Sequence, residues 1–160
     1  MLAPEGRVTI LRLQLRERRF PVSEENKAAL QRFYEEVLNK HNLALIDELA
    51  APNFVDHNPS PGQTPGREGL KDSFRQMLAA FPDLRVTVDD LLAEADKVAA
   101  HITMKGTHKG EFMGIAPTGR QVEMRISDIV RIAGGKAVER WGVEDSLGML
   151  TQLGVVTPPA

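Results

Sequence analysis

The chain contains no cysteine in its 160 residues. This absence excludes disulfide bridges, thiolate metal sites and cysteine nucleophiles, and it is compatible with any redox compartment. A strong charge of one sign is also missing, since 20 basic and 22 acidic residues give a formal net charge of −2 at pH 7. Recognition of nucleic acid or of an anionic membrane surface requires a basic patch. We therefore expect neither nucleic acid nor a membrane as a partner.

Long hydrophobic runs are absent as well, because no stretch approaches the roughly 20 apolar residues that a transmembrane helix needs. Residues 1–22 form a basic N-terminal extension that carries Arg7, Arg12, Arg16, Arg18 and Arg19. A secretory signal has a longer apolar centre and a small-residue cleavage site. We interpret the extension as an extra strand, an arm that clasps a partner or the product of a start codon placed too far upstream, with a targeting segment as the alternative. We expect a soluble, cytoplasmic protein.

Residues 23–157 are expected to form a single domain, because a hydrophobic content of 42% supplies enough apolar mass for one core. Apolar residues at helical spacing predict three helices in the first half of the chain, over residues 23–39, 43–50 and 67–81. Pro52 is expected to interrupt the second of them, since proline cannot continue a helix.

The apolar period changes to two after the third helix, which predicts β-strands. A first hairpin is expected to turn at residues 94–97. A second joins residues 122–132 to 136–143 through Gly134-Gly135, a dipeptide suited to the positive φ angles of a tight turn. Residues 54–58, before the third helix, also read as extended. Three helices followed by an antiparallel meander describe an α+β fold.

Two charged residues, Asp128 and Arg140, interrupt otherwise apolar strands. Asp128 shares its face with Ile126 and Val130, because side chains two residues apart in a strand lie on the same side. A carboxylate in an apolar pocket is less easily ionised and can accept a proton near neutral pH. Asp128 is thus a candidate general base, or else only the partner of Arg140. Arg140 either holds a substrate oxyanion through its donor fork or only neutralises Asp128.

The segment Asp56-His57-Asn58-Pro59 is a second candidate for chemistry. Histidine changes its charge near neutral pH, so His57 is a candidate proton relay and completes a predicted catalytic set with Asp128 and Arg140. The alternative is a turn that Asp56 and Asn58 stabilise, with His57 partly solvated. The four histidines lack the close spacing of metal ligands, so we expect no metal and no other cofactor.

Pocket-lining residues are predicted among polar and large apolar side chains near these candidates, although the apolar ones also fit a core. His108, in a loop flanked by glycine, either closes over a ligand or lies at the surface. Trp141, the only tryptophan, has the opposite parity to Arg140 and lies on the far face or in a dimer interface unless a bulge turns it. The predicted substrate-binding residues are Tyr34, Asp56, Phe74, Met77, His108, Phe112, Met113 and Trp141.

Three stretches, NFVDHNPSPGQTPGREGLKDSF, GTHKGEFMGIAPTGRQV and SDIVRIAGGKAVERWGVEDSLG, resemble the SnoaL-like polyketide cyclase or ester cyclase family of the nuclear transport factor-like superfamily. The resemblance covers about Glu24 to Gly154. It implies a cone-shaped, curved antiparallel sheet wrapped around the three helices, with an apolar pocket in the cone. Characterised members close a ring in a polyketide intermediate by an intramolecular aldol reaction without a cofactor. Other superfamily members are epoxide hydrolases, dehydratases, isomerases or binding domains.

The catalytic residues of that family do not carry over to this chain. The family's aspartate acid/base, a few residues after the Gly-Lys turn, falls on Gly142, and its accompanying histidines fall on Asp128 and Arg140. The resemblance therefore implies cofactor-independent acid/base chemistry by other residues on a small hydrophobic carbonyl compound. The alternatives are a non-catalytic domain that binds a small hydrophobic molecule and an epoxide hydrolase-like enzyme. Exposed apolar and threonine residues on the outer faces of residues 98–105 and 120–132 predict a homodimer.

Overall fold

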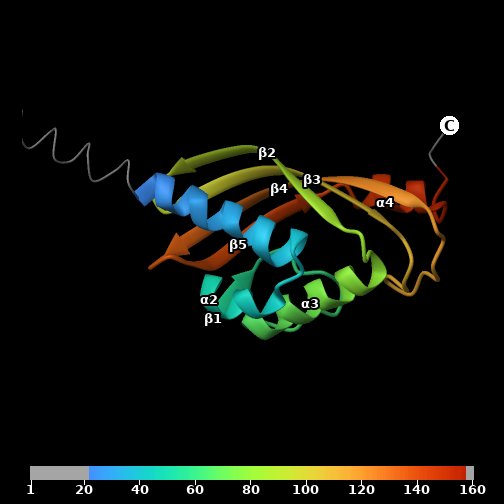
Figure 1. Ribbon diagram of the computed structural model, residues 1–160, viewed down its shortest axis with the longest axis horizontal. Helices are drawn as coiled ribbons and strands as arrows, with labels where there is room; N and C mark the ends of the chain where they lie inside the picture. Colours follow the sequence, from blue (N-terminus) through green and yellow to red (C-terminus); the bar gives the residue numbers. More distant parts are fainter. Residues whose placement is uncertain (1–21, 158–160) are drawn as a thin grey trace, which may run out of the picture.

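The computed structural model describes residues 22–157, and these form a curled five-stranded sheet with helices against it (Figure 1). The predicted α+β fold is confirmed. The strands follow the order β1-β5-β4-β3-β2 across the sheet. The predicted extension of residues 1–22 lies outside the described residues except for Val22, which is already helical. The strands are β1 (Ala50–Asp56), β2 (Arg85–Glu94), β3 (Lys97–Thr107), β4 (Gln121–Ala133) and β5 (Lys136–Glu144).

The first predicted helix spans residues 22–39, and its last turns, η1 (Phe33–Asn39), are π-helical. The wider winding appears in the bond from the Lys40 amide to the Glu35 carbonyl at 3.1 Å. Local π turns in helices are frequent at functional sites, and this one carries the buried Tyr34. The third predicted helix is α3 (Gly66–Ala80).

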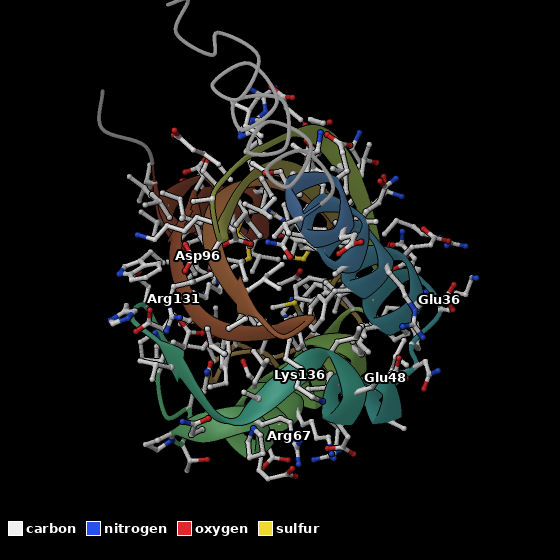
Figure 2. All side chains as sticks on the ribbon, turned by 90° about the vertical axis from the view of Figure 1, so that its left-hand side faces the viewer. Glu36, Glu48, Arg67, Asp96, Arg131 and Lys136 are labelled. Carbon is white, nitrogen blue, oxygen red and sulfur yellow. The ribbon has the colours of Figure 1, made fainter. Side chains whose placement is uncertain are left out.

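The second predicted helix is shorter than the apolar pattern suggests. It consists of η2 (Leu43–Leu45) and α2 (Ile46–Leu49), and Ala50 already begins β1, so Pro52 lies inside a strand and does not end the helix. Side chains from elsewhere stabilise this short helix, because Lys136 donates to the Glu48 carbonyl at 2.6 Å and Arg67 to the Asp47 carbonyl at 3.1 Å. Figure 2 shows Lys136, Glu48 and Arg67 close together at this end of the molecule. Cations bound to terminal carbonyls favour a helix C-terminus.

Strands β2 to β5 form the predicted antiparallel meander. Both predicted turns are present, and Gly134 and Gly135 have φ angles of 57° and 75°. One pairing differs from the expected antiparallel sheet, because β1 lies parallel to β5 at the edge. A strand pattern predicts an extended segment but carries no information about its partner or direction.

The sequence pattern also missed helix α4 (Ser146–Leu153), which follows β5. Its N-terminus is capped by Asp145, whose side chain accepts from the Gly148 amide at 2.9 Å. Gly154 ends it in the left-handed conformation. Met149 and Leu153 are its buried residues, and the helix has only 8 residues. A helical period is read over a window of roughly 11 to 18 residues, so this segment is too short to show one clearly.

The inner face of the sheet packs against η1 and α3 and contains most of the core. Alternate residues of β4 are buried from Val122 to Ile132, and Asp128 belongs to this buried row with 6% of its surface exposed. The predicted placement of Asp128 on a buried face is therefore correct. Among residues 22–157 no helix is both long and apolar enough to cross a membrane.

Candidate functional site

Arg140 lies at the centre of an ionic cluster on the inner face of the sheet. Its Nε and Nη2 atoms are both 2.9 Å from Asp128 Oδ1. Its Nη1 atom is 3.3 Å from both carboxylate oxygens of Asp56, and Nη2 is also 3.2 Å from Glu144 Oε1. We call these four residues the Arg140 cluster. Every guanidinium nitrogen contacts a carboxylate, so the predicted role of Arg140 in neutralising Asp128 fits its geometry better than binding of a substrate oxyanion.

Strand register explains why residues so distant in sequence meet here. Asp56 of β1 stands beside Arg140 of β5 in the parallel pair. Asp128 of β4 stands beside Gly142 of β5 in the antiparallel pair. Arg140, Gly142 and Glu144 are two residues apart and share the inner face. Three neighbouring strands thus each contribute a carboxylate to one guanidinium.

The guanidinium of Arg140 remains charged in this setting. Burial acts to lower the pKa of Arg140, but the negative charges of Asp128, Asp56 and Glu144 outweigh this effect, and the pKa is raised above its ordinary value. Buried charges are tolerated when they are paired and hydrogen-bonded. The cluster meets this condition for its one cation.

Tyr34 connects the first helix to the cluster. Its hydroxyl donates to Asp128 Oδ2 at 2.9 Å. Burial raises the pKa of Tyr34 well above the ordinary value for tyrosine, and the nearby charge of Asp128 and the hydrogen bond to it act in the same direction. Tyr34 is therefore a neutral donor to Asp128 at physiological pH. Tyr34 also lines the inner hollow described below.

Alkaline titration is expected to report on Tyr34 directly, because it is the only tyrosine. The folded protein holds this proton above pH 10, where an unfolded chain has released it, so the free energy of unfolding falls as pH rises. The contribution of Tyr34 to this slope approaches about 1.4 kcal/mol per pH unit between its unfolded and folded pKa values. The free energy of unfolding, measured by urea denaturation at several pH values above 10, should fall more steeply with pH in the unsubstituted protein than in Tyr34→Phe. Equal slopes in both would contradict a raised pKa for Tyr34.

Within the segment Asp56-His57-Asn58-Pro59, Asp56 both stabilises the turn and belongs to the Arg140 cluster. Asp56 accepts from the Asn58 amide at 3.0 Å and from Gln63 Nε2 at 3.3 Å, besides its contacts with Arg140. Asn58 Oδ1 in turn accepts from the Gly142 amide at 3.0 Å. Asp56 is therefore a buried, fully engaged carboxylate that fixes this loop against β5.

His57 and Trp141 lie on the outer face of the sheet, away from the Arg140 cluster. Their side chains project opposite to Asp56 and Arg140 because strand residues alternate. The two rings stack with centroids 4.6 Å apart and planes 5° from parallel. Lys97 Nζ lies 5.0 Å from the Trp141 ring centre, and His57 Nε2 is 3.8 Å from Glu139 Oε1. The structure thus separates His57 from Asp128 and Arg140, with which it was grouped in the predicted catalytic set.

Two adjoining hollows lie next to the cluster. The large cavity has a volume of about 880 Å³, and the inner hollow has a volume of about 80 Å³. Asp56, Asp128, Arg140 and Phe74 line only the inner hollow. The residues that line both, and so join them, are Ser60, Ser73, Met77, Met104 and Glu144.

The large cavity is mostly lined by apolar and flexible side chains. Every methionine of residues 22–157 borders it, namely Met77, Met104, Met113, Met124 and Met149. Phe112 lies beside them, so the predicted positions Met77, Phe112 and Met113 are brought together here. Methionine adapts its shape to irregular apolar partners. A cavity of this size and lining is typical of a site for a small hydrophobic molecule.

His108 does not border either hollow, although it was a candidate ligand contact. It is fully buried, which also differs from the surface loop considered as the alternative. Its Nδ1 atom accepts from the Thr118 amide at 3.2 Å, and its ring stacks on Phe81 with centroids 5.3 Å apart. These contacts anchor the loop between β3 and β4.

Glu144 and Gly142 are the site residues that the sequence reasoning did not single out for their own chemistry. Their even spacing from Arg140 was the available signal, since it places both on the inner face. A Cβ atom on Gly142 would lie 2.7 Å from Asp128 Oδ1 and 2.5 Å from Arg140 Cζ. A side chain at position 142 would therefore displace the Arg140 guanidinium or the Asp128 carboxylate. In residues 22–157 no group of three or more His, Asp and Glu side chains is arranged to hold a metal ion.

Solved structures with the same fold come from several Streptomyces species. TsrD from Streptomyces laurentii is 28% identical, with 83% of this chain and 97% of that chain covered and a TM-score of 0.76. IdmH from Streptomyces antibioticus, a candidate polyketide cyclase, is 38% identical, with 81% and 99% covered and a TM-score of 0.70. AclR from Streptomyces galilaeus, a candidate hydroxylase, is 31% identical, with 85% and 89% covered and a TM-score of 0.75.

A search of curated protein sequences gives no match. The family model for SnoaL-like polyketide cyclases, by contrast, matches residues 28–153, which is most of the chain. This span includes η1, the whole sheet and α4, and with them every residue of the Arg140 cluster. The chain belongs to the SnoaL-like polyketide cyclase family.

Proposed function

We propose that this protein is a cofactor-independent enzyme that transfers protons on a small hydrophobic carbonyl compound bound in the large cavity. The Arg140 cluster is the observation that carries the proposal. Three carboxylates surround one guanidinium, and one of them, Glu144, also lines the large cavity. A carboxylate that a guanidinium holds in place beside a bound substrate is suited to acid/base catalysis.

The reaction that fits this site begins with loss of a proton from the carbon next to a carbonyl group. A carboxylate takes that proton, and the electron pair of the C–H bond forms an enolate. In a substrate with a second carbonyl group, the enolate carbon attacks the second carbonyl carbon and closes a ring. The new alkoxide then takes up a proton. Similarity to the candidate polyketide cyclase IdmH supports this reaction class.

A second function, binding without catalysis, is favoured by one observation. All nitrogens of Arg140 are already engaged by carboxylates, and an ionic cluster of this kind can serve structure alone. The large cavity would then hold a hydrophobic molecule without changing it.

Hydrogen–deuterium exchange separates the two functions without knowledge of the natural substrate. The probe is 2-tetralone, a bicyclic ketone with acidic protons next to its carbonyl group, incubated with the protein in D₂O and followed by NMR. The enzyme should accelerate exchange above the buffer rate, and 2-naphthol, a planar mimic of the enol, should inhibit it. Binding of 2-naphthol without any acceleration of exchange, for 2-tetralone or a panel of cyclisable diketones, would favour the binding domain.

We also propose a homodimer that forms through the outer face of the sheet. In register across four strands lie Leu92, Ala99, Ile129 and Trp141. Leu92 is 66% exposed and Ile129 is 44% exposed, which is unusual for large apolar side chains in one row. Self-association of this face would bury the row twice.

Substitution of Ile129 tests the dimer. Light scattering at micromolar concentration should give about twice the monomer mass of 17.7 kDa for the unsubstituted protein, and the monomer mass for Ile129→Asp. Leu147→Asp, at an exposed position outside the row, is the control and should leave the mass at the dimer value. A monomeric unsubstituted protein would contradict the proposal.

A further inference from the structure

The two carboxylates that face the large cavity are not the ones that hold Arg140 most tightly. Among the residues lining this cavity, Glu111 and Glu144 are the acidic ones, whereas Asp56 and Asp128 border only the inner hollow. The inner hollow has a volume of about 80 Å³, which is below the roughly 300 Å³ at which pockets for organic ligands begin. A bicyclic or larger ketone therefore sits in the large cavity, where it meets Glu144 or Glu111.

Glu144 is held in place, and Glu111 is not. Glu144 Oε1 accepts from Arg140 Nη2 at 3.2 Å, and its side chain is 33% exposed. Within residues 22–157, no group donates a hydrogen bond to its other oxygen, Oε2. Glu111 lies exposed in the loop between β3 and β4. One anchored oxygen and one free oxygen is the arrangement that a general base needs, because the anchor fixes the geometry and the free atom accepts the proton.

Asp128 and Asp56 lack a free oxygen. Asp128 accepts from Arg140 at Oδ1 and from Tyr34 at Oδ2. Asp56 accepts from Asn58 at Oδ1 and from Gln63 at Oδ2, and Arg140 contacts both of its oxygens. These two carboxylates fix the guanidinium, and the guanidinium fixes Glu144. Both are positioning residues.

We infer that Glu144 is the catalytic base of this protein, and this inference rests on the proposed function. Oε2 of Glu144 takes a proton from the carbon next to the substrate carbonyl, and the C–H electron pair becomes that of the enolate. The protonated Glu144 afterwards returns the proton to carbon or gives it to the alkoxide formed in ring closure, which restores the carboxylate. No other reactant is required.

The test compares Glu144→Gln with Asp128→Asn and Glu111→Gln in the exchange of 2-tetralone with D₂O. General-base loss typically lowers a rate by about 10² to 10⁴, and this loss is expected for Glu144→Gln. Asp128→Asn is expected to lower the rate by about tenfold or less and Glu111→Gln by less than about twofold, because neither removes the proton acceptor. The control is Glu123→Gln, which removes an exposed carboxylate from the outer face of β4.

Two further measurements keep a folding defect apart from a catalytic one. Thermal unfolding and 2-naphthol binding should be nearly unchanged in Glu144→Gln, whose amide oxygen still accepts from Arg140. The pH dependence of kcat/KM should lose its acidic limb in Glu144→Gln and keep it in Asp128→Asn. Exchange that survives in Glu144→Gln but disappears in Asp128→Asn or Glu111→Gln would overturn this inference and leave the proposed function standing. An unsubstituted protein without exchange activity would overturn both.

Discussion

Arg140→Met is expected to destabilise the folded protein by about 3 to 5 kcal/mol at pH 7, because removal of one partner from a buried ionic group leaves uncompensated charge. Three carboxylates would then face one another with only neutral donors around them. The folded variant is expected to bind more protons than the unfolded chain, so its stability should rise as the pH is lowered from 7 towards 5. Urea denaturation across this range measures both the loss and its recovery.

Arg131→Met is the matched control for this experiment. Arg131 of β4 also forms an ionic pair, with its Nε 2.7 Å from Oε2 of Glu139 on β5, but this pair is partly exposed on the outer face. Exposed pairs contribute little to stability, so its unfolding midpoint should change only slightly and without the same pH dependence. If Arg140→Met is no less stable than Arg131→Met at pH 7, Arg140 does not stabilise the fold by compensating the charge of the three carboxylates.

Gly142→Asp is expected to destabilise the protein by about 3 kcal/mol or more, since it adds both overpacking and a fourth carboxylate to the cluster. The new Cβ would lie 2.7 Å from Asp128 Oδ1 and against the Arg140 guanidinium. Gly142→Ala adds the Cβ without the charge and is expected to cost about 1 to 3 kcal/mol. Chemical denaturation of both variants separates the steric part from the electrostatic part.

Position 142 also tests whether the Arg140 cluster and the aspartate–histidine arrangement of characterised cyclases exclude each other. In the resemblance to characterised cyclases, an aspartate falls on Gly142 and histidines fall on Asp128 and Arg140. The triple variant Asp128→His, Arg140→His, Gly142→Asp removes the groups that the new side chain strikes, so it should be more stable than Gly142→Asp alone. A triple variant that is less stable than the single one would show that the remaining cluster residues, Asp56 and Glu144, do not accommodate the family arrangement.

The sequence by itself determined the class of fold and most of the elements. Period-two alternation placed Asp128 on a buried face of β4, and Gly134-Gly135 marked the turn between β4 and β5, because both features depend on neighbours within a few residues. The same local logic missed α4, which has only 8 residues, and misjudged Pro52, which the parallel edge strand β1 accommodates. Proline is tolerated at sheet edges, where its missing donor is not needed.

The sequence also brought Asp128 and Arg140 together as a pair, and only the tertiary structure decided that they belong to a larger cluster. Asp56 joins them because β1 lies parallel to β5. This pairing connects segments far apart in the sequence, since Asp56 and Arg140 are 84 residues apart. His57 leaves the site for the same reason, since the register that turns Asp56 inward turns His57 outward onto Trp141. Residue type and spacing fix which side of a strand a side chain takes, but contacts between strands are set by long-range packing.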